Sequence, residues 1–389
     1  MRSCDVAVIG AGVFGSWTAY RLAREGVSVL LIDAYGAASN RASSGGESRI
    51  IRMAYGPDEV YTRFSYRSLA LWKEFFAETG HNLLHRTGVL GFAAPGHPSV
   101  RDSAVVLKKC GVPFEDLSGE EIERRWPQFH FEAPVRGLYE PESGALMARR
   151  AVQSVAASVE KAGGRYRIAQ VLPPAGRGRP VGRGRMEALP LASSDTVRAA
   201  AYVFACGPWL PKVFPELLGQ RIFPTRQEVF FFGIPPGCKE FSSPELPVWL
   251  DRLHATIPYG LPSLENRGLK VALDVHGPAF DPDAGERTPT TGAIEETRRY
   301  VASRFPALAD APVVESRVCQ YENTSNGDFL IDRHPDFDNV WIAGGGSGHG
   351  FKHGPAVGEY LTDRIQGRGV EERRFSLRTK ETVQRRAVY

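Results

Sequence analysis

Residues 4–33 have the pattern of one complete strand–helix–strand unit. A short apolar run at residues 4–9 leads into the sequence GAGVFG at residues 10–15, and a helical stretch follows until Gly26 ends it. A second apolar run, residues 27–32, closes the unit. Two short apolar strands on either side of a helix predict a buried parallel sheet covered by helices, which is an α/β fold.

The glycines of this unit have separate tasks in binding a dinucleotide. Gly10 permits the tight turn, Gly12 lets the backbone approach a pyrophosphate, and Gly15 lets the helix pack against the strand. The helix N-terminus favours that pyrophosphate, and Asp33, 18 residues after Gly15, can accept hydrogen bonds from ribose hydroxyls. The pattern predicts dinucleotide binding, with a glycine turn that binds nothing as the alternative, and it leaves NAD or FAD open. The expected cofactor-binding residues of the unit are Gly10, Gly12, Val13, Phe14, Gly15 and Asp33.

A loop of small residues, 37–46, follows in place of the further strand–helix units that a nicotinamide enzyme would continue with. Arg49 and Arg52 stand three positions apart beside this loop. Guanidinium groups suit anions, here a cofactor phosphate or a substrate carboxylate. The alternative for each arginine is a solvated surface charge.

A second strand–glycine–helix pattern lies near the C-terminus. Residues 340–343 are apolar, residues 344–350 include five glycines, and residues 355–365 have a helical pattern. A glycine-rich loop at a helix N-terminus suits a negatively polarised group. The pyrimidine edge of reduced flavin is such a group, which this helix end and Lys352 would stabilise. The alternative is a connecting turn.

The two glycine-rich units lie at opposite ends of the chain, with unrelated sequence between them. Residues 196–206 form a largely apolar run closed by Gly207, typical of a strand that returns to the nucleotide-binding sheet. The simplest arrangement is a discontinuous Rossmann-like domain with an inserted substrate domain on an antiparallel or mixed sheet. The expected boundaries are residues 1–85, 149–218 and 316–389 for the cofactor domain, and residues 86–148 and 219–315 for the substrate domain.

Composition excludes several other classes of protein. The 389 residues carry a net charge of only +4, which argues against a nucleic-acid binder, and the five scattered cysteines without a CxxC pair argue against disulfides or a zinc site. We find neither a signal-peptide pattern nor the ~18 consecutive apolar residues of a membrane helix. We therefore expect a cytoplasmic enzyme, monomeric or weakly homo-oligomeric, without metal, membrane or nucleic-acid partners. The arginine-rich segment 173–185 could be a nucleic-acid arm, but its glycines and prolines favour a solvated loop.

Six separated motifs resemble the monomeric sarcosine oxidase family. They are similar also to N-methyltryptophan oxidase, pipecolate oxidase and the fructosyl amino acid oxidases, and they span nearly the whole chain in order. The resemblance implies an FAD enzyme of the D-amino-acid-oxidase structural class. Such enzymes oxidise the C–N bond of a secondary amine to an imine and reduce O2 to hydrogen peroxide. The motifs are residues 9–15, 48–56, 268–270, 319–321, 329–335 and 347–352.

The resemblance also implies roles around the flavin ring. Cys319 matches the cysteine that holds flavin covalently, although any single cysteine is otherwise a small buried hydrophobe. Lys270 matches a lysine that assists oxygen reduction, and a fixed ammonium does stabilise the anions superoxide and peroxide. Without that context, Lys270 would be a solvated strand residue. The further cofactor-binding residues expected are Ser43, Ser44, Arg49, Gly346, Gly348, His349, Gly350 and Lys352.

For the substrate, the resemblance implies a carboxylate bound by Arg52 and Lys352. Tyr321 matches a tyrosine that lines the same cavity, and Tyr259 either lines it or packs in the core. The catalytic residues expected are thus Lys270, Arg52, Lys352, Tyr321 and Tyr259.

The chain departs from the pattern of the sarcosine type at two places. Ser44 and Gly45 stand where relatives often carry a histidine pair, and Asp274 stands where they can present a histidine. An acid at 274 favours a cationic or hydroxyl-bearing substrate tail over a simple N-methyl glycine. His276 is either a compensating active-site group or an outward-facing strand residue, and we favour the latter. Three rivals remain open: a flavin dehydrogenase of the same fold, a biosynthetic oxidase of a saccharopine-like, sugar-conjugated or cyclic imino acid, and a non-catalytic flavin-binding module.

Overall fold

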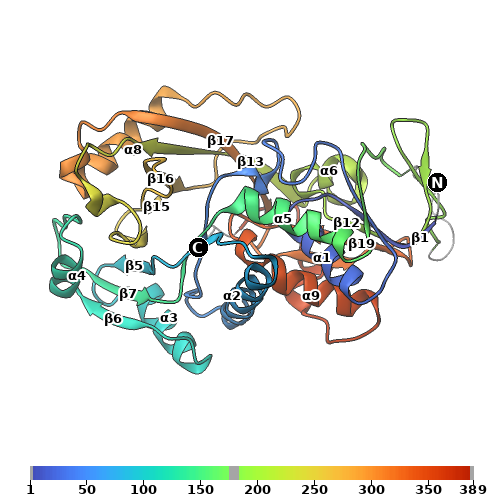
Figure 1. The fold of residues 1–389 in the computed structure, drawn as a ribbon, viewed down its shortest axis with the longest axis horizontal. Helices are drawn as coiled ribbons and strands as arrows, with labels where there is room; N and C mark the ends of the chain where they lie inside the picture. Colours follow the sequence, from blue (N-terminus) through green and yellow to red (C-terminus); the bar gives the residue numbers. More distant parts are fainter. Residues whose placement is uncertain (1–2, 175–183, 386–389) are drawn as a thin grey trace.

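The computed structural model describes residues 3–174 and 184–385 of the chain. Residues 175–183, which make up most of the arginine-rich segment considered above, lie outside the described residues. Two sheets organise the fold. One lies with helices α1, α5 and α9, and the other forms the lobe at the opposite end of the view in Figure 1. The α/β architecture expected from the sequence is confirmed.

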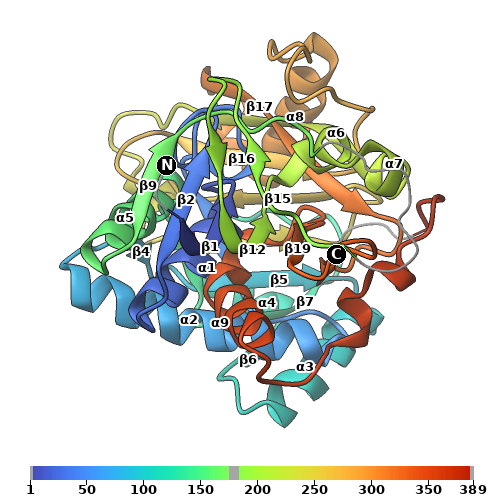
Figure 2. The ribbon, with the colours of Figure 1, turned by 90° about the vertical axis from the view of Figure 1, so that its right-hand side faces the viewer.

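The first sheet has six strands in the order β18-β19-β12-β1-β2-β9. Every neighbouring pair is parallel except β18–β19, which is antiparallel at the edge. The predicted strand at residues 196–206 does return to this sheet, since β12 lies between β1 and β19 (Figure 2). The strands are β1 (Cys4–Ile9), β2 (Val29–Asp33), β9 (Arg165–Ile168), β12 (Ala199–Phe204), β18 (Leu330–Arg333) and β19 (Val340–Gly344).

Four helices pack together beside this sheet. Helix α1 (Val13–Arg24) contacts both α5 (Ala148–Lys161) and α9 (Gly354–Ile365), and α9 contacts α2 (Glu59–Thr79). Trp17 of α1 is 2% exposed, and its ring centroid lies 5.0 Å from that of Trp72 of α2. The aromatic core therefore joins the N-terminal unit to the C-terminal helix, and it brings the two predicted glycine turns to one place.

The second sheet has eight strands in the order β17-β13-β16-β15-β14-β5-β7-β6, antiparallel except at β14–β5. Helix α8 (Thr291–Arg304) contacts β13 and β16, and α4 (Gly119–Arg125) contacts β6 and β7, whereas α3 (Pro98–Lys109) contacts β5 and β7. The strands are β5 (Val89–Ala93), β6 (Glu115–Ser118), β7 (Arg136–Glu140), β13 (Ile222–Phe232), β14 (Val248–Asp251), β15 (Ile257–Leu261), β16 (Leu269–Asp274) and β17 (Val313–Thr324).

The two faces of this sheet bury different residues because side chains alternate along a strand. Trp249 and Val271 belong to an aromatic core shared with Tyr300 and Val301 of α8. The residues between and beside them, such as Leu250 and Lys270, face the other side. That second face carries the candidate site.

Short elements complete the fold. Helices α6 (Leu210–Val213) and α7 (Pro215–Leu218) follow β12. A three-stranded sheet contains β3 (Arg49–Ile51), β8 (Gly144–Leu146) and β4 (Leu84–His85), and a hairpin contains β10 (Leu189–Pro190) and β11 (Thr196–Val197). The 3-10 turns are η1 (Ser43–Gly45), η2 (Gly207–Trp209), η3 (Lys239–Phe241), η4 (Pro306–Leu308), η5 (Phe351–His353), η6 (Arg373–Phe375) and η7 (Leu377–Thr379). None of the helices in the described part of the chain combines the length and apolarity needed to cross a bilayer.

One expected domain boundary does not coincide with a strand end. The boundary at residue 316 falls inside β17, and the whole of β17 pairs with β13 in the second sheet. A boundary after Thr324 follows the sheets better. The division into two domains otherwise stays a prediction.

Candidate flavin and amine site

Two adjoining cavities lie between the sheets. The larger, of about 760 Å³, is lined by residues of both glycine-rich units together with Cys319 and Glu322. The second, of about 500 Å³, is lined by Arg52, Lys352 and Asp274 among others. They share four residues: Arg49, Tyr321, Gly348 and Phe351. The two cavities therefore share one wall.

The N-terminal glycine turn has the close packing that was predicted. Gly10 has a φ of +103°, and a Cβ there would lie 2.3 Å from the backbone oxygen of Ala205. A Cβ at Gly15 would lie 1.9 Å from the oxygen of Gly10, so α1 can approach the strand only with glycine at this position. Gly12 differs: its Cβ would meet Ser44 Oγ at 3.5 Å, and Gly12 lines the larger cavity.

Side chains around this turn hold it from two directions. Ser44 Oγ accepts a hydrogen bond of 3.1 Å from the N–H of Val13, at the start of α1. The carboxylate of Asp33 accepts bonds from the backbone N–H of Ala11 at 2.7 Å and of Tyr35 at 2.8 Å. Burial raises the pKa of Asp33, and these N–H donors oppose the rise. Asp33 thus orders the turn in this structure, and its predicted ribose contact stays a prediction.

The C-terminal glycine loop faces the same cavity from β19. Gly346, Gly348 and Gly350 line it, as do Val13, Phe14, Ser43 and Ser44. A Cβ at Gly348 would lie 2.6 Å from the ring of Tyr321, and this glycine has a φ of +78°. The chain then turns through η5 into α9. The structure therefore brings the two predicted glycine units together around one cavity.

Cys319 and Arg49 meet at the inner end of the larger cavity. Arg49 Nη2 lies 3.3 Å from Cys319 Sγ and donates a 2.7 Å bond to the backbone oxygen of Ser43. Cys319 is buried, and both residues line the cavity. Arg49 thus donates a hydrogen bond to a thiol in the wall of the cavity.

Lys270 lies on the far side of Ser48 and lines a third, smaller cavity of about 230 Å³. Its Nζ donates a 2.7 Å bond to the backbone oxygen of Ser48, and its side chain is 4% exposed. Burial, then the charge of Arg49, holds the pKa of Lys270 well below its usual value. Lys270 therefore lies apart from the second cavity, with Arg49 and Ser48 nearest to it.

The second cavity gathers the four other predicted catalytic residues. Tyr321 Oη donates a 3.0 Å hydrogen bond to Asp274 Oδ1. Burial raises the pKa of Asp274, and the Tyr321 bond and the charges of Arg52 and Lys352 oppose the rise. Tyr259 lines the same cavity and also packs against the hydrophobic core, so both of its predicted settings apply, and burial with Asp274 raises its pKa to about 12.

Arg52 and Lys352 are held by the same tyrosine. The Arg52 guanidinium lies over the ring of Tyr55 at 4.4 Å and donates to the backbone oxygen of Ala54. Lys352 Nζ donates to Tyr55 Oη at 2.8 Å and to the backbone oxygen of His349 at 2.9 Å. Burial, then the charge of Arg52, holds the pKa of Lys352 well below its usual value. Two adjacent cations that face one cavity form a site for an anion.

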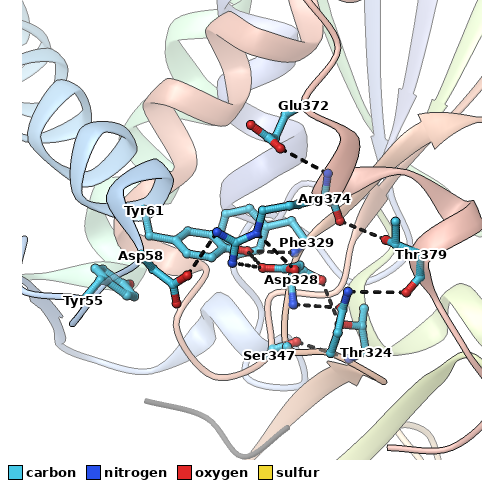
Figure 3. A network of polar contacts seen from close by, with 12 residues as sticks. Tyr55, Asp58, Tyr61, Thr324, Asp328, Phe329, Ser347, Glu372, Arg374 and Thr379 are labelled. Carbon is cyan, nitrogen blue, oxygen red and sulfur yellow. Dashed lines mark hydrogen bonds and ion pairs between the residues drawn. The ribbon is translucent and has the colours of Figure 1, made fainter. Parts of the chain in front are cut away.

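A clamp of polar contacts joins the C-terminal segment to the region around Asp328 (Figure 3). His349 Nε2 lies 3.0 Å from the backbone oxygen of Gly327, next to Asp328. Arg374 Nη2 donates to Asp328 Oδ1 at 2.6 Å, and Tyr61 Oη donates to the same oxygen at 2.8 Å. Because Arg374 Nη1 also lies 3.0 Å from Asp58 Oδ1, the clamp joins three separate segments behind the cavity.

Three contributors to the site were not anticipated from the sequence. Tyr55 holds the two cations, and Glu140 accepts the backbone N–H bonds of Met53 and Ala54, at 2.6 Å and 3.1 Å, so it fixes the loop after Arg52. Glu322 lines the larger cavity, where it accepts bonds from Gly346 N–H and Ser43 Oγ. Burial raises the pKa of Glu322 to about 7. An acid three residues after Cys319 was the one available signal.

His276 matches neither of its two predicted settings in full, because it follows the end of β16 at Asp274 and is half-buried rather than facing outward from the strand. Its Nδ1 lies 2.6 Å from Gln384 Nε2 of the C-terminal segment, away from the residues that line the second cavity. Among the described residues, no group of three or more histidines, cysteines and acids could hold a metal ion.

The lining of the larger cavity fits FAD. The unsubstituted Gly12 and the helix N-terminus suit a pyrophosphate, and a Cβ at Gly12 would project into this space. Glu322 is the one carboxylic acid among the lining residues, and its raised pKa reduces the negative charge near phosphates. Arg49 and Cys319 then face the end that adjoins the second cavity.

Comparison with known proteins agrees with this reading of the cavity. The family described as FAD dependent oxidoreductase matches residues 5–364. The chain is 32% identical over 371 residues to monomeric sarcosine oxidase of Bacillus sp. (strain B-0618), covering 92% of this chain and 91% of the relative. It is 31% identical over 366 residues to peroxisomal sarcosine oxidase of Homo sapiens, covering 92% and 90%. The structure of L-proline dehydrogenase from P. horikoshii superposes with a TM-score of 0.81 at 21% identity, covering 95% of each chain, which shows the shared fold.

Proposed function

The chain belongs to the FAD-dependent oxidoreductase family, and from that premise we propose that it oxidises a secondary amine of the amino-acid type with O2. The substrate is an N-methyl, N-substituted or cyclic amino acid, and the products are an imine and hydrogen peroxide. FAD would supply the two-electron chemistry that couples oxidation of the C–N bond to reduction of O2. The observation that carries the proposal is the cation pair Arg52 and Lys352 in a cavity that adjoins the cofactor cavity.

In this proposal Arg52 and Lys352 bind the substrate carboxylate by charge-assisted hydrogen bonds. Tyr55 fixes both cations from behind, so little side-chain entropy is lost when the substrate binds. The carboxylate then orients the carbon beside the amine toward the wall shared by the two cavities. A neutral amine is the form that gives up electrons, and the nearby cations lower the pKa of the substrate ammonium.

The other chemistry in the proposal concerns O2. Arg49 lines the wall shared by the two cavities, the buried Lys270 lies near it across Ser48, and both groups would stabilise superoxide and peroxide, which are anions. Replacing Lys270 with Met is expected to slow reoxidation of the reduced protein by O2 by about 100-fold or more. Stopped-flow absorbance would measure this step separately from reduction by the amine, with the exposed Lys239→Met as control. Equal reoxidation rates in K270M and the parent protein would remove Lys270 from the proposal.

We further propose that Cys319 would hold FAD covalently, as a thioether to a ring methyl. The thiol S–H and one methyl C–H bond are lost as the C–S bond forms, and O2 would accept the two electrons released. The support is its position in the cavity wall with Arg49 Nη2 at 3.3 Å from Sγ. Acid precipitation of the parent protein should then leave the yellow chromophore in the pellet, whereas Cys319→Ser releases it. Cys206→Ser is the matched control, because Cys206 lines the same cavity. Release of all the chromophore from the parent protein would show that no bond forms.

One experiment tests the function as a whole. An anaerobic panel of N-methyl and cyclic amino acids is expected to bleach the flavin, and readmitted O2 should restore the colour with release of hydrogen peroxide. Arg52→Ala should raise the apparent KM by about 10- to 100-fold, because a charged hydrogen bond is lost. Bleaching without reoxidation by O2 would instead indicate the dehydrogenase, and no bleaching by any amine would refute amine oxidation.

Two coarser expectations accompany this proposal. We propose that the protein acts in the cytoplasm as a monomer or weak homo-oligomer, and that it consists of the two domains described above with the last boundary moved to Thr324. Light scattering and limited proteolysis would test the oligomeric state and the boundaries.

A further inference from the structure

Arg252 is a cation on the site-bearing face of the second sheet that the proposed activity leaves unused. It follows β14 directly, and its N–H still bonds the oxygen of Phe92 on β5. Side chains alternate along a strand, so Arg252 faces the same side as Leu250. Leu250 lines the second cavity, whereas the intervening Asp251 is buried on the opposite face against Arg304.

The register of the sheet places Arg252 close to the amine end of the site. Leu250 pairs with Tyr259, so continuing the antiparallel register by two residues sets Arg252 opposite Ile257. Ile257 pairs in turn with Asp274. Asp274 and Arg252 therefore stand in one row, two strands or about 10 Å apart at their backbones.

Among the described residues no carboxylate forms an ion pair with Arg252, and the neighbouring acids Asp251, Asp274 and Glu140 are engaged elsewhere. Asp251 lies 2.9 Å from Arg304 Nη2, and Asp274 accepts the bond from Tyr321. Glu140 is occupied by the N–H groups of the loop after Arg52 and by Ser143 Oγ.

The Arg252 side chain is half-buried and packs against β5. Its guanidinium occupies the space over Gly91, where a Cβ would be 3.2 Å from Arg252 Nη1. Burial, then the like charge of Arg52, lowers the pKa of Arg252 to about 10, and the charges of Asp274, Glu140 and Asp251 oppose the fall. Two partly buried guanidinium groups repel each other unless anions neutralise them.

We infer that the substrate carries a second acidic group, bound by Arg252, in addition to the carboxylate bound by Arg52 and Lys352. This inference rests on the proposed function and narrows its substrate to an N-substituted dicarboxylic amino acid. Arg52 and Lys352 already bind one carboxylate. Arg252 would therefore contribute more binding free energy by pairing with a second anion than by joining the first pair. Among the substrates left open by the sequence, the saccharopine-like class has this chemistry.

The test compares acids with their neutral amides. N-methyl-L-aspartate, N-methyl-L-glutamate and N-methyl-L-2-aminoadipate are each assayed for flavin reduction beside the corresponding side-chain amide. In the parent protein at least one acid is expected to exceed its amide about 10- to 100-fold in kcat/KM, as for a charged hydrogen bond. Arg252→Gln should bring that ratio close to one, and Arg252→Lys should give an intermediate ratio.

A matched control separates specificity from damage to the sheet. Arg136→Gln alters an arginine of β7 in the same sheet whose Nε lies 2.7 Å from Asp116 Oδ1, and it should leave the acid-to-amide ratio unchanged. Flavin content and thermal midpoint report folding of each variant. Equal rates for every acid and its amide in the parent protein would overturn the inference, as would an unchanged ratio in R252Q.

A binding measurement keeps this outcome distinct from failure of the proposed function. Glutarate and butyrate are titrated into the oxidised holoprotein, and the shift of the flavin absorbance gives Kd for each. Glutarate is expected to bind at least about tenfold more tightly than butyrate, and R252Q should abolish the difference. Selective glutarate binding without amine oxidation would support Arg252 and refute the oxidase, whereas amine oxidation with equal Kd values would refute Arg252 alone.

Discussion

Replacing Gly12 with alanine should separate cofactor binding from folding. Gly12 has φ −75° and ψ −175°, which alanine adopts freely, and the nearest atom to a new Cβ is Ser44 Oγ at 3.5 Å. The folded apoprotein is therefore expected to tolerate the change. Reduced freedom of the unfolded chain should even stabilise it by about 0.4–1 kcal/mol.

FAD binding should be affected in the opposite direction. Gly12 lines the larger cavity at the N-terminus of α1, so a methyl group would displace a pyrophosphate from the helix N–H groups. Loss of one or two charge-assisted hydrogen bonds costs about 3 kcal/mol, or roughly 100-fold in Kd. With FAD at 1,000 times the parent Kd, stabilisation by FAD should fall from about 4 to about 1.4 kcal/mol.

The assay is thermal unfolding of the apoprotein, purified from riboflavin-starved cells, with and without added FAD. All proteins compared carry Cys319→Ser, so that FAD binds reversibly. Gly15→Ala is the matched comparison, because its Cβ would lie 1.9 Å from the oxygen of Gly10 and should cost about 3 kcal/mol or more even without FAD. The reasoning is refuted if G12A destabilises the apoprotein as G15A does, or if G12A gains as much stability from FAD as the parent protein.

Two further predictions concern the support of the site. Because burial raises the pKa of Glu322 from 4.5 to about 7, the folded apoprotein binds this proton more tightly than the unfolded chain, so stability falls as pH rises from about 4.5 to 7. Glu322→Gln should remove at most about 3 kcal/mol of this pH-dependent loss of stability, which urea unfolding at pH 5 and pH 8 would measure. The same pH dependence of stability in the variant and the parent protein would contradict the raised pKa of Glu322. Arg374→Met removes the cation that pairs with the nearly buried Asp328 and should lower the free energy of unfolding by about 2 kcal/mol. This loss is smaller than that for breaking a fully buried ion pair, because the Arg374 side chain is 31% exposed. An unchanged urea midpoint would show that the clamp contributes nothing to stability.

Local chemistry made the glycine units predictable from the sequence. The first strand was expected at residues 4–9 and is β1, and the helix that Gly26 was expected to end is α1, which ends at Arg24. Gly26 has a φ of +79°, a conformation that glycine adopts without strain. Such signals depend on a few consecutive residues, so they can be read without knowing what the chain packs against.

The residues that complete the site lacked that kind of signal. Tyr55 and Glu140 act on Arg52 and Lys352 through contacts that join segments far apart in the chain. Arg252 becomes informative only when β14, β15 and β16 are aligned in register. The boundary expected at residue 316 falls inside β17 for the same reason. Only the pairing of β17 with β13 shows that β17 belongs to the second sheet.

The sequence by itself determined the dinucleotide-binding turn, the second glycine loop and the charged residues available for chemistry. Their types and spacing restrict the backbone through sterics and short-range hydrogen bonds. Tertiary structure alone decided which of those charges face one cavity and which form ion pairs with a neighbour. It also decided which, like Arg252, form no ion pair among the described residues. That outcome depends on strand register and burial, and both arise from contacts between residues that are distant along the chain.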